Sequence, residues 1–156
     1  MNKKEFLEAL RTERNRWEAV LAEVSEARMT EPGVAGEWSV KDIIAHVTWF
    51  EREMRDMVRA RALAGSDLWD LPQGQRNATL FEANRARPLE EVLTEARAVF
   101  DQLWESLKTL TDEDLNDAGR FADMPADWIP WQIIADNSFE HYPHHISDIH
   151  AWLARL

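Results

Sequence analysis

Three histidines are the residues of this chain whose types and spacing are suited to chemistry. His141 and His145 are four residues apart near the C-terminus, whereas His46 lies in the first third of the chain. Imidazoles at positions i and i+4 of a helix lie about 40° apart around its axis and one turn apart along it, so both can face one ion. A third imidazole from another helix would leave positions open for water or substrate. Such an open ligand set is typical of a reactive metal centre.

His46 falls in a segment with helical periodicity. Ser39 is a suitable N-cap, and Asp42 three residues later occupies the position of the acidic partner in a capping box. We expect the helix that begins there to continue to about Ala64, with Gly65 at its C-terminal stop. His46 shares the apolar stripe of this helix and should face the interior of the protein.

The two C-terminal histidines fall in a helix that we expect to begin at Pro130. Its inward row consists of Ile134, Ser138, His141, His145, Ile149 and Trp152. Pro143 removes the hydrogen bond to the carbonyl of Phe139, so it predicts a kink or interruption between the two proposed ligands. That kink would either tune the ligand geometry or spoil it.

The remaining helical segments suggest how these elements are arranged. We expect a first helix over residues 3–25, an irregular crossover over 66–74, a short helix over 75–86, a long helix that begins near Pro88 and a solvated acidic loop over 111–128. Four long helices with a long crossover between the second and third predict an all-α four-helix bundle, a form that places metal sites on facing helices. Residues 1–156 should form a single domain.

Composition restricts the function further. The formal net charge of −11 disfavours binding to nucleic acid, and the chain contains no cysteine, so any reacting thiol must come from a small molecule. No run approaches the roughly 18 apolar residues of a membrane span. The N-terminus lacks the apolar core of a signal peptide, so we expect a cytoplasmic protein with no membrane partner.

Each candidate residue also has an ordinary structural explanation. A single interior histidine is usually a hydrogen-bonded core residue, and His-x-x-x-His pairs on helices are common by chance. His144 is a rival ligand to His145, whereas His150 should lie on the surface. Asp42 is placed either to orient the imidazole of His46 or only to cap the helix.

Other residues near the proposed site have the same two interpretations. Trp49 and Trp131 either line a pocket beside the histidines or only fill the core. Asn77, Asn84 and Arg85, in the crossover region, are weaker candidates for reaching a ligand. Glu140 and Tyr142 are close in sequence to His141 but are not clearly on its face of the helix, and the position of each is also compatible with the rim of the site only. The sequence assigns no catalytic nucleophile or base.

Two motifs resemble those of a known family. Trp38, Ser39, Asp42 and His46 resemble the Trp-Ser-x-x-Asp-x-x-x-His start of the second helix in the DinB-like superfamily, and the segment that ends in His141 and His145 resembles its His-x-x-x-His signature. Residues 84–92 and the tail from Trp131 to Trp152 are closer to the ClbS/DfsB branch. Pro143, His144, Ser147 and Asp148 depart from the usual His-x-x-x-His-Arg-Gly-Gln continuation.

The resemblance implies a DinB-like bundle in which His46, His141 and His145 bind a divalent ion such as Zn, Ni or Fe. Members of the superfamily include transferases that use the low-molecular-weight thiols bacillithiol, mycothiol or glutathione. The ClbS branch includes a protein that protects its host from a genotoxin by opening an electrophilic cyclopropane.

Three classes of function follow from these expectations. The first is a metal-dependent enzyme that transfers a thiol to a small electrophilic or toxic compound, or hydrolyses it, in stress or toxin resistance. The second is a non-catalytic bundle that binds a toxin in a tryptophan-rich pocket. The third retains the histidines as scaffold and acts through oligomerisation. A homodimer is compatible with each class.

Overall fold

The computed structural model describes residues 1–155, and over that range it is entirely helical apart from two isolated β-bridges. The α-helices are α1 (Lys3–Ala22), α2 (Val40–Ala60), α3 (Gln73–Asn84), α4 (Leu89–Lys108), α5 (Asp112–Asn116), α6 (Pro130–Asp136) and α7 (Tyr142–Ala154). Three 3-10 turns, η1 (Glu26–Arg28), η2 (Asp67–Asp70) and η3 (Ala118–Arg120), lie in the connections. The predicted all-α fold is confirmed.

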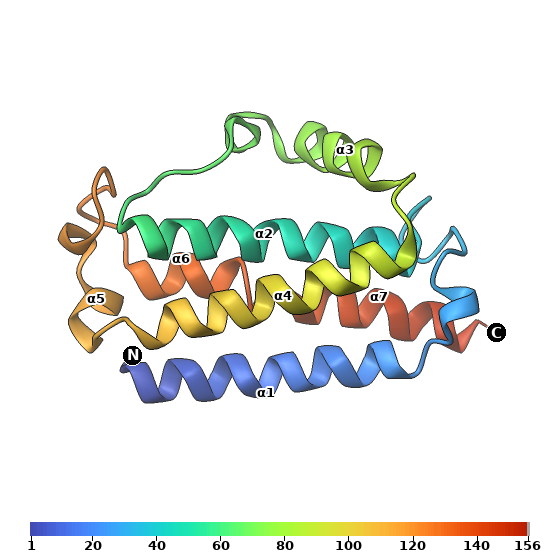
Figure 1. The fold of residues 1–156 in the computed structure, drawn as a ribbon, viewed down its shortest axis with the longest axis horizontal. Coiled ribbons are helices and arrows are strands. Elements are labelled where there is room, and N and C mark those ends of the chain that lie inside the picture. The colour runs from blue at the N-terminus through green and yellow to red at the C-terminus, as the bar shows by residue number, and fades with distance from the viewer. Residues whose placement is uncertain (156) are drawn as a thin grey trace.

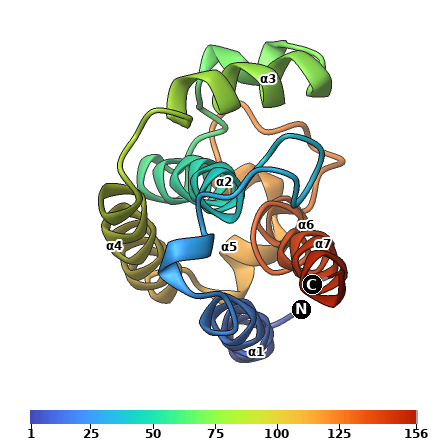
Figure 2. The same ribbon diagram turned by 90° about the vertical axis from the view of Figure 1, so that its right-hand side faces the viewer.

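Four helical rods surround one core. Helices α1, α2 and α4 are three of them, and α6 followed by α7 forms the fourth (Figure 1). Viewed along their length, the rods occupy the corners of a bundle, while α3 lies outside it against α2 (Figure 2). The crossover between the second and third long helices therefore covers one face of the bundle. None of the described helices has both the length and the hydrophobicity that a membrane crossing needs.

Helix α2 begins as predicted and ends earlier. The Asp42 carboxylate accepts from the backbone N–H of Ser39 at 2.9 Å, and the Ser39 hydroxyl accepts from the backbone N–H of Asp42 at 3.2 Å; these two hydrogen bonds form the capping box. The helix ends at Ala60 instead of about Ala64, because Arg61 adopts a left-handed conformation with φ 50°. The carbonyl of Arg61 then accepts from the backbone N–H of Ala122 at 2.9 Å. This long-range pairing, and not Gly65, draws the chain away from the helix axis.

The C-terminal segment that was predicted as one helix from Pro130 forms two helices. It divides into α6 and α7, and the break covers residues 137–141, so it ends at His141 and does not separate His141 from His145. Pro143 sits in the first turn of α7, where its missing N–H removes no helical hydrogen bond. The expected kink between His141 and His145 is therefore wrong. His141 has a right-handed helical conformation, and the turn of helix from it to His145 is uninterrupted.

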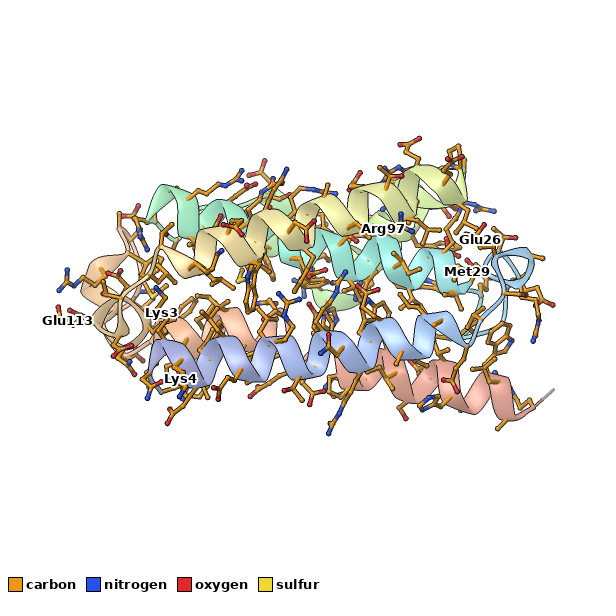
Figure 3. The ribbon with its side chains drawn as sticks, turned by 60° about the horizontal axis from the view of Figure 1, so that its bottom comes forward. Lys3, Lys4, Glu26, Met29, Arg97 and Glu113 are labelled. Atoms are coloured by element: carbon orange, nitrogen blue, oxygen red, sulfur yellow. The ribbon has the colours of Figure 1, made fainter. Side chains whose placement is uncertain are left out.

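The acidic connection over 111–128 is more ordered than predicted. It contains α5 and η3, and its apolar side chains Leu115, Ala118, Phe121 and Met124 are buried. Most of its other residues are exposed, as expected of a solvated loop. The backbone N–H of Lys3 donates to Asp112 at 2.7 Å, so the start of α1 and helix α5 lie at the same end of the molecule, where Figure 3 labels Lys3 and Glu113.

Smaller differences affect the other boundaries. Helix α1 ends at Ala22 instead of residue 25, α3 spans 73–84 instead of 75–86, and Pro88 is the N-cap of α4 instead of a first-turn residue. These changes leave the order and packing of the helices as expected.

A buried ion pair ties three of the rods together. A single nitrogen of Arg14, on α1, lies 3.0 Å from each carboxylate oxygen of Glu51, on α2. The hydroxyl of Tyr142, on α7, donates to the same carboxylate at 2.8 Å. Glu51 and Tyr142 are fully buried and Arg14 nearly so. Burial raises the pKa of the Glu51 carboxyl, whereas Arg14 and Tyr142 act in the opposite direction.

We predict that breaking this pair destabilises the protein strongly. Glu51→Leu should lower the free energy of unfolding by about 3–5 kcal/mol, because it removes the buried counter-ion of Arg14 and leaves its guanidinium only the exposed carboxylate of Glu18. Urea unfolding measures the change. Arg14→Met combined with Glu51→Leu should cost less than the sum of the two single changes.

The matched control is Arg16→Ala, which removes an exposed ion pair with Glu13 on the same helix. It should change stability by at most about 1 kcal/mol. Equal effects of the buried and the exposed replacement would contradict the assigned role of the buried pair.

Candidate metal centre

The three predicted histidines meet inside the bundle. His46 lies in the second turn of α2, His141 immediately precedes α7, and His145 lies in the first turns of α7. The Nε2 atom of His141 is 3.3 Å from Nε2 of His46 and 2.9 Å from Nε2 of His145. One ligand nitrogen from each ring lies within 4.8 Å of the other two. The predicted convergence is confirmed.

These distances fit a shared cation. Nitrogen ligands sit about 2.0–2.1 Å from a zinc ion, and two such ligands that subtend 90–110° at the metal are about 2.9–3.4 Å apart. Hydrogen bonding alone accounts for the cluster poorly. A neutral Nε2 carries either one hydrogen or one lone pair, so that of His141 can form a well-directed hydrogen bond to only one neighbour. Three converging lone pairs would all be satisfied by one ion.

The protonation state of the cluster favours metal binding. Burial, together with the charges of neighbouring residues, lowers the pKa of His46 to about 2 and that of His141 to about 3. Burial also lowers the pKa of His145 to about 4, although Asp148 opposes the shift. All three imidazoles are therefore neutral at pH 7, which is the form that binds a metal ion.

Aromatic packing, and not a carboxylate, orients the rings. The ring of Phe50 contacts those of His46 and His141 at centroid distances of 4.8 and 4.7 Å, and Trp38 contacts His46 at 5.1 Å. The Nδ1 atoms of the three histidines are buried and have no hydrogen-bond partner in the described chain. Asp42 does not orient His46, because its carboxylate serves the helix cap. The suggested orienting role of Asp42 is wrong.

The rival residues lie outside the cluster. The His144 side chain is exposed and offers no nitrogen to the group of three. His150 is also exposed and lies 3.2 Å from the carboxylate of Glu23, as expected of a surface residue. Glu140 is exposed, whereas Tyr142 is fully buried and donates to Glu51, so Tyr142 is not a rim residue.

The sequence did not predict several contacts around the histidines, although Trp38 belongs to the motif that it revealed. The indole of Trp38 stacks on the Phe81 ring of α3 at 5.7 Å and thereby brings the crossover over His46. Trp69, in η2, packs against Phe50 at 5.5 Å. The apolar periodicity of α2 could not reveal them, because both lie outside that helix. Arg76 of α3, which faces the same rings, was not singled out either.

The other named residues have mixed outcomes. Trp49 is buried and packs on Phe50 and Trp69, one layer away from the imidazoles. Trp131 is half-buried and packs against the main core. Arg85 pairs with Glu82 on the exposed side of α3, and the side-chain amide of Asn84 donates to the carbonyl of Leu80. In contrast, Oδ1 of Asn77 is buried without a partner.

A cavity of about 520 Å³ lies beside Trp69. Its apolar walls include Met54, Met57, Leu63, Trp69, Trp128 and Ile133, and its polar groups include Glu53, Ser66 and Asn137. The carboxylate of Glu53 accepts from the indole N–H of Trp69 at 2.7 Å and so fixes this wall. Trp69, which lines the cavity, packs on Phe50, and Phe50 in turn packs on His46.

The sequence pattern of one protein family covers nearly the whole chain. The pattern of the DinB superfamily matches residues 9–149, a range that contains all three histidines. The chain belongs to the DinB superfamily. No functionally curated protein matches it.

Solved structures share the DinB fold at low sequence identity. A structural-genomics protein from Streptococcus pneumoniae has a TM-score of 0.83 and 12% identity, and the match covers 99% of this chain and 91% of the other. DfsB, described as a sibling lethal factor precursor, has a TM-score of 0.78, 16% identity and coverage of 99% and 96%. An uncharacterised protein from Escherichia coli UTI89 has a TM-score of 0.76, 16% identity and coverage of 99% and 94%.

The lowered histidine pKa values predict how the metal-free protein responds to acid. The folded pKa values lie below the ordinary value of 6.5, so below pH 6.5 the unfolded chain binds more protons than the folded chain. The free energy of unfolding should therefore fall as the pH decreases from about 6.5 to about 4. Each histidine contributes up to about 1.4 kcal/mol per pH unit.

Urea unfolding in the presence of a chelator, repeated between pH 7 and pH 4.5, measures this slope. His46→Gln should make the slope shallower, whereas His150→Gln, at an exposed position, should leave it unchanged. Identical slopes for wild type and His46→Gln would contradict the assignment of a neutral buried imidazole.

Proposed function

We propose that this DinB superfamily protein is a metal-dependent enzyme that acts on small electrophilic or toxic molecules in stress or toxin resistance. In this proposal His46, His141 and His145 hold one divalent cation such as Zn, Ni or Fe. The observation that supports it is the convergence of three neutral imidazole nitrogens at separations that suit a single ion.

The residues of the chain define what such a centre can do. A divalent ion bound there would act as a Lewis acid that favours a thiolate or lowers the pKa of water. Three protein ligands leave further coordination positions for that thiol or water. Phe50 and Trp38 shield the imidazoles, which strengthens the electrostatic interactions of a bound substrate. Because the chain has no cysteine, a thiol co-substrate must be a small molecule.

The cavity beside Trp69 favours a second candidate function, the binding of a toxin without turnover. Its volume is in the range that holds a small molecule, and it combines an apolar lining with a few polar groups. Trp128, which is 39% exposed, lies at this cavity and offers a large ring to a ligand. The two candidate functions differ in one respect: the enzyme needs the histidine centre to protect the cell from a toxin, whereas the binding protein does not.

The ligand assignment predicts the metal content of single variants. Protein purified without a histidine tag should bind about one equivalent of Zn or Ni, measured by elemental analysis after dialysis. His46→Ala, His141→Ala and His145→Ala should each weaken that binding by more than about 100-fold, because replacing groups that only support a ligand already costs 10–100-fold.

His144→Ala and His150→Ala are the matched controls, and both should keep the wild-type stoichiometry. Retention of one equivalent of metal by the three core variants would show that the ligand assignment is wrong. Loss of metal from His144→Ala would instead indicate that His144 is one of the metal ligands.

Turnover assays distinguish the versions of the proposal. We expect metal-loaded protein to consume an electrophile such as monochlorobimane or an activated ester, with a rate that depends on added glutathione or another low-molecular-weight thiol. His46→Ala should reduce this rate to the background measured without protein. A reaction rate that no added thiol changes would exclude thiol transfer and favour hydrolysis. Metal-loaded protein that binds the electrophile without consuming it would favour the binding function.

A further inference from the structure

Arg76 is a cation next to the histidine centre and has no carboxylate partner among residues 1–155. Its Nε atom is buried without a hydrogen-bond partner, and one terminal nitrogen reaches only the carbonyl of Leu71, at 3.5 Å. A distance of 3.5 Å is at the limit of a hydrogen bond, so the guanidinium is poorly satisfied. Burying such donors without acceptors costs free energy.

Arg76 projects from α3 toward the rings that surround the histidines. Its guanidinium carbon lies 5.1 Å from the ring centre of Trp69 and 5.9 Å from that of Phe50, and Phe50 contacts both His46 and His141. The positive charge of Arg76 also contributes to the low pKa of His46, so its field reaches that imidazole. The guanidinium of Arg76 and the rings of His46 and His141 therefore contact the same side chain, that of Phe50.

Neighbouring cations of the crossover are already satisfied. Arg85 pairs with Glu82, and Arg87 pairs with Glu91 and Glu95. Lys41 donates to two backbone carbonyls near the end of α3. Arg76 thus differs from its neighbours in offering free donors at the site, although the chain as a whole carries a net charge of −11 and would repel anions.

We propose that Arg76 binds a carboxylate on the small molecule that reaches the histidine centre. The planar guanidinium fork matches a carboxylate in shape and charge, and it would hold one end of the ligand while the other end lies at the three nitrogens. Arg76 is then a specificity and positioning residue, and the preferred ligand is an anionic thiol or an anionic electrophile. This inference rests on the proposed metal centre.

A matched pair of thiols tests the inference without measuring turnover. Cobalt-loaded protein is titrated with 3-mercaptopropionate, which carries a carboxylate, and with 2-mercaptoethanol, which does not, and thiolate binding is followed by cobalt absorption. Arg76→Gln should weaken 3-mercaptopropionate by about 10- to 100-fold, the range expected for hydrogen bonds to a charged group, and should change 2-mercaptoethanol by less than about 2-fold. Arg76→Lys should recover part of the loss.

Arg85→Gln, at the exposed C-cap of the same helix, is the control and should bind both thiols as wild type does. Equal effects of Arg76→Gln on the two thiols, or none on either, would overturn the inference. Circular dichroism of each variant verifies that α3 and the bundle remain folded.

A second arm separates this inference from the proposed function. Calorimetry with 3-hydroxypropionate, performed on the cobalt-loaded and the metal-free protein, measures carboxylate binding without a thiol. If cobalt fails to bind, the metal centre is wrong, yet an Arg76-dependent heat in the metal-free protein would still support the carboxylate site. If cobalt binds and no carboxylate ligand depends on Arg76, only the further inference fails.

Discussion

The buried contact between Arg14, Glu51 and Tyr142 is the constraint on which the rest of the molecule depends. It joins α1, α2 and α7 at a point where water is excluded, and each partner comes from a different rod. Tyr142 directly follows His141, and Glu51 directly follows Phe50, which touches two of the imidazoles. Fixing Tyr142 against Glu51 therefore also fixes the height of His141 relative to His46. Buried ion pairs add little net stability, but here the pair defines one register of the helices.

The sequence predicted those parts of the structure that local chemistry determines. The capping box at Ser39 and Asp42 fixed the start of α2, and the four-residue spacing of His141 and His145 placed both on one helical turn. The position of His46 on an apolar stripe was enough to place it inside the bundle. The sequence also predicted an irregular crossover over residues 66–74, where the structure has the 3-10 turn η2 and the start of α3.

The features that it missed depend on contacts between distant segments. Helix α2 ends at Arg61 because the backbone of Arg61 pairs with that of Ala122. The local sequence does not predict a left-handed conformation for this arginine. Pro143 suggested a kink, but the break that precedes it turns the proline into a first-turn residue. Arg14 and Glu51 are ordinary charged residues of amphipathic helices until the fold places them together. Tertiary contacts overrule local propensity at each of these positions.

Because α3 lies outside the four rods, the metal-ligand candidates and the helix that covers them belong to different parts of the molecule. The four rods carry the histidines, whereas α3 lies outside them and meets α2 through aromatic contacts such as the stack of Trp38 on Phe81 (Figure 2). Side chains on this outer helix can change without disturbing the core, since Leu80 is its only buried residue. Substitutions on α3 can therefore change which ligand is preferred while the three imidazoles keep their positions.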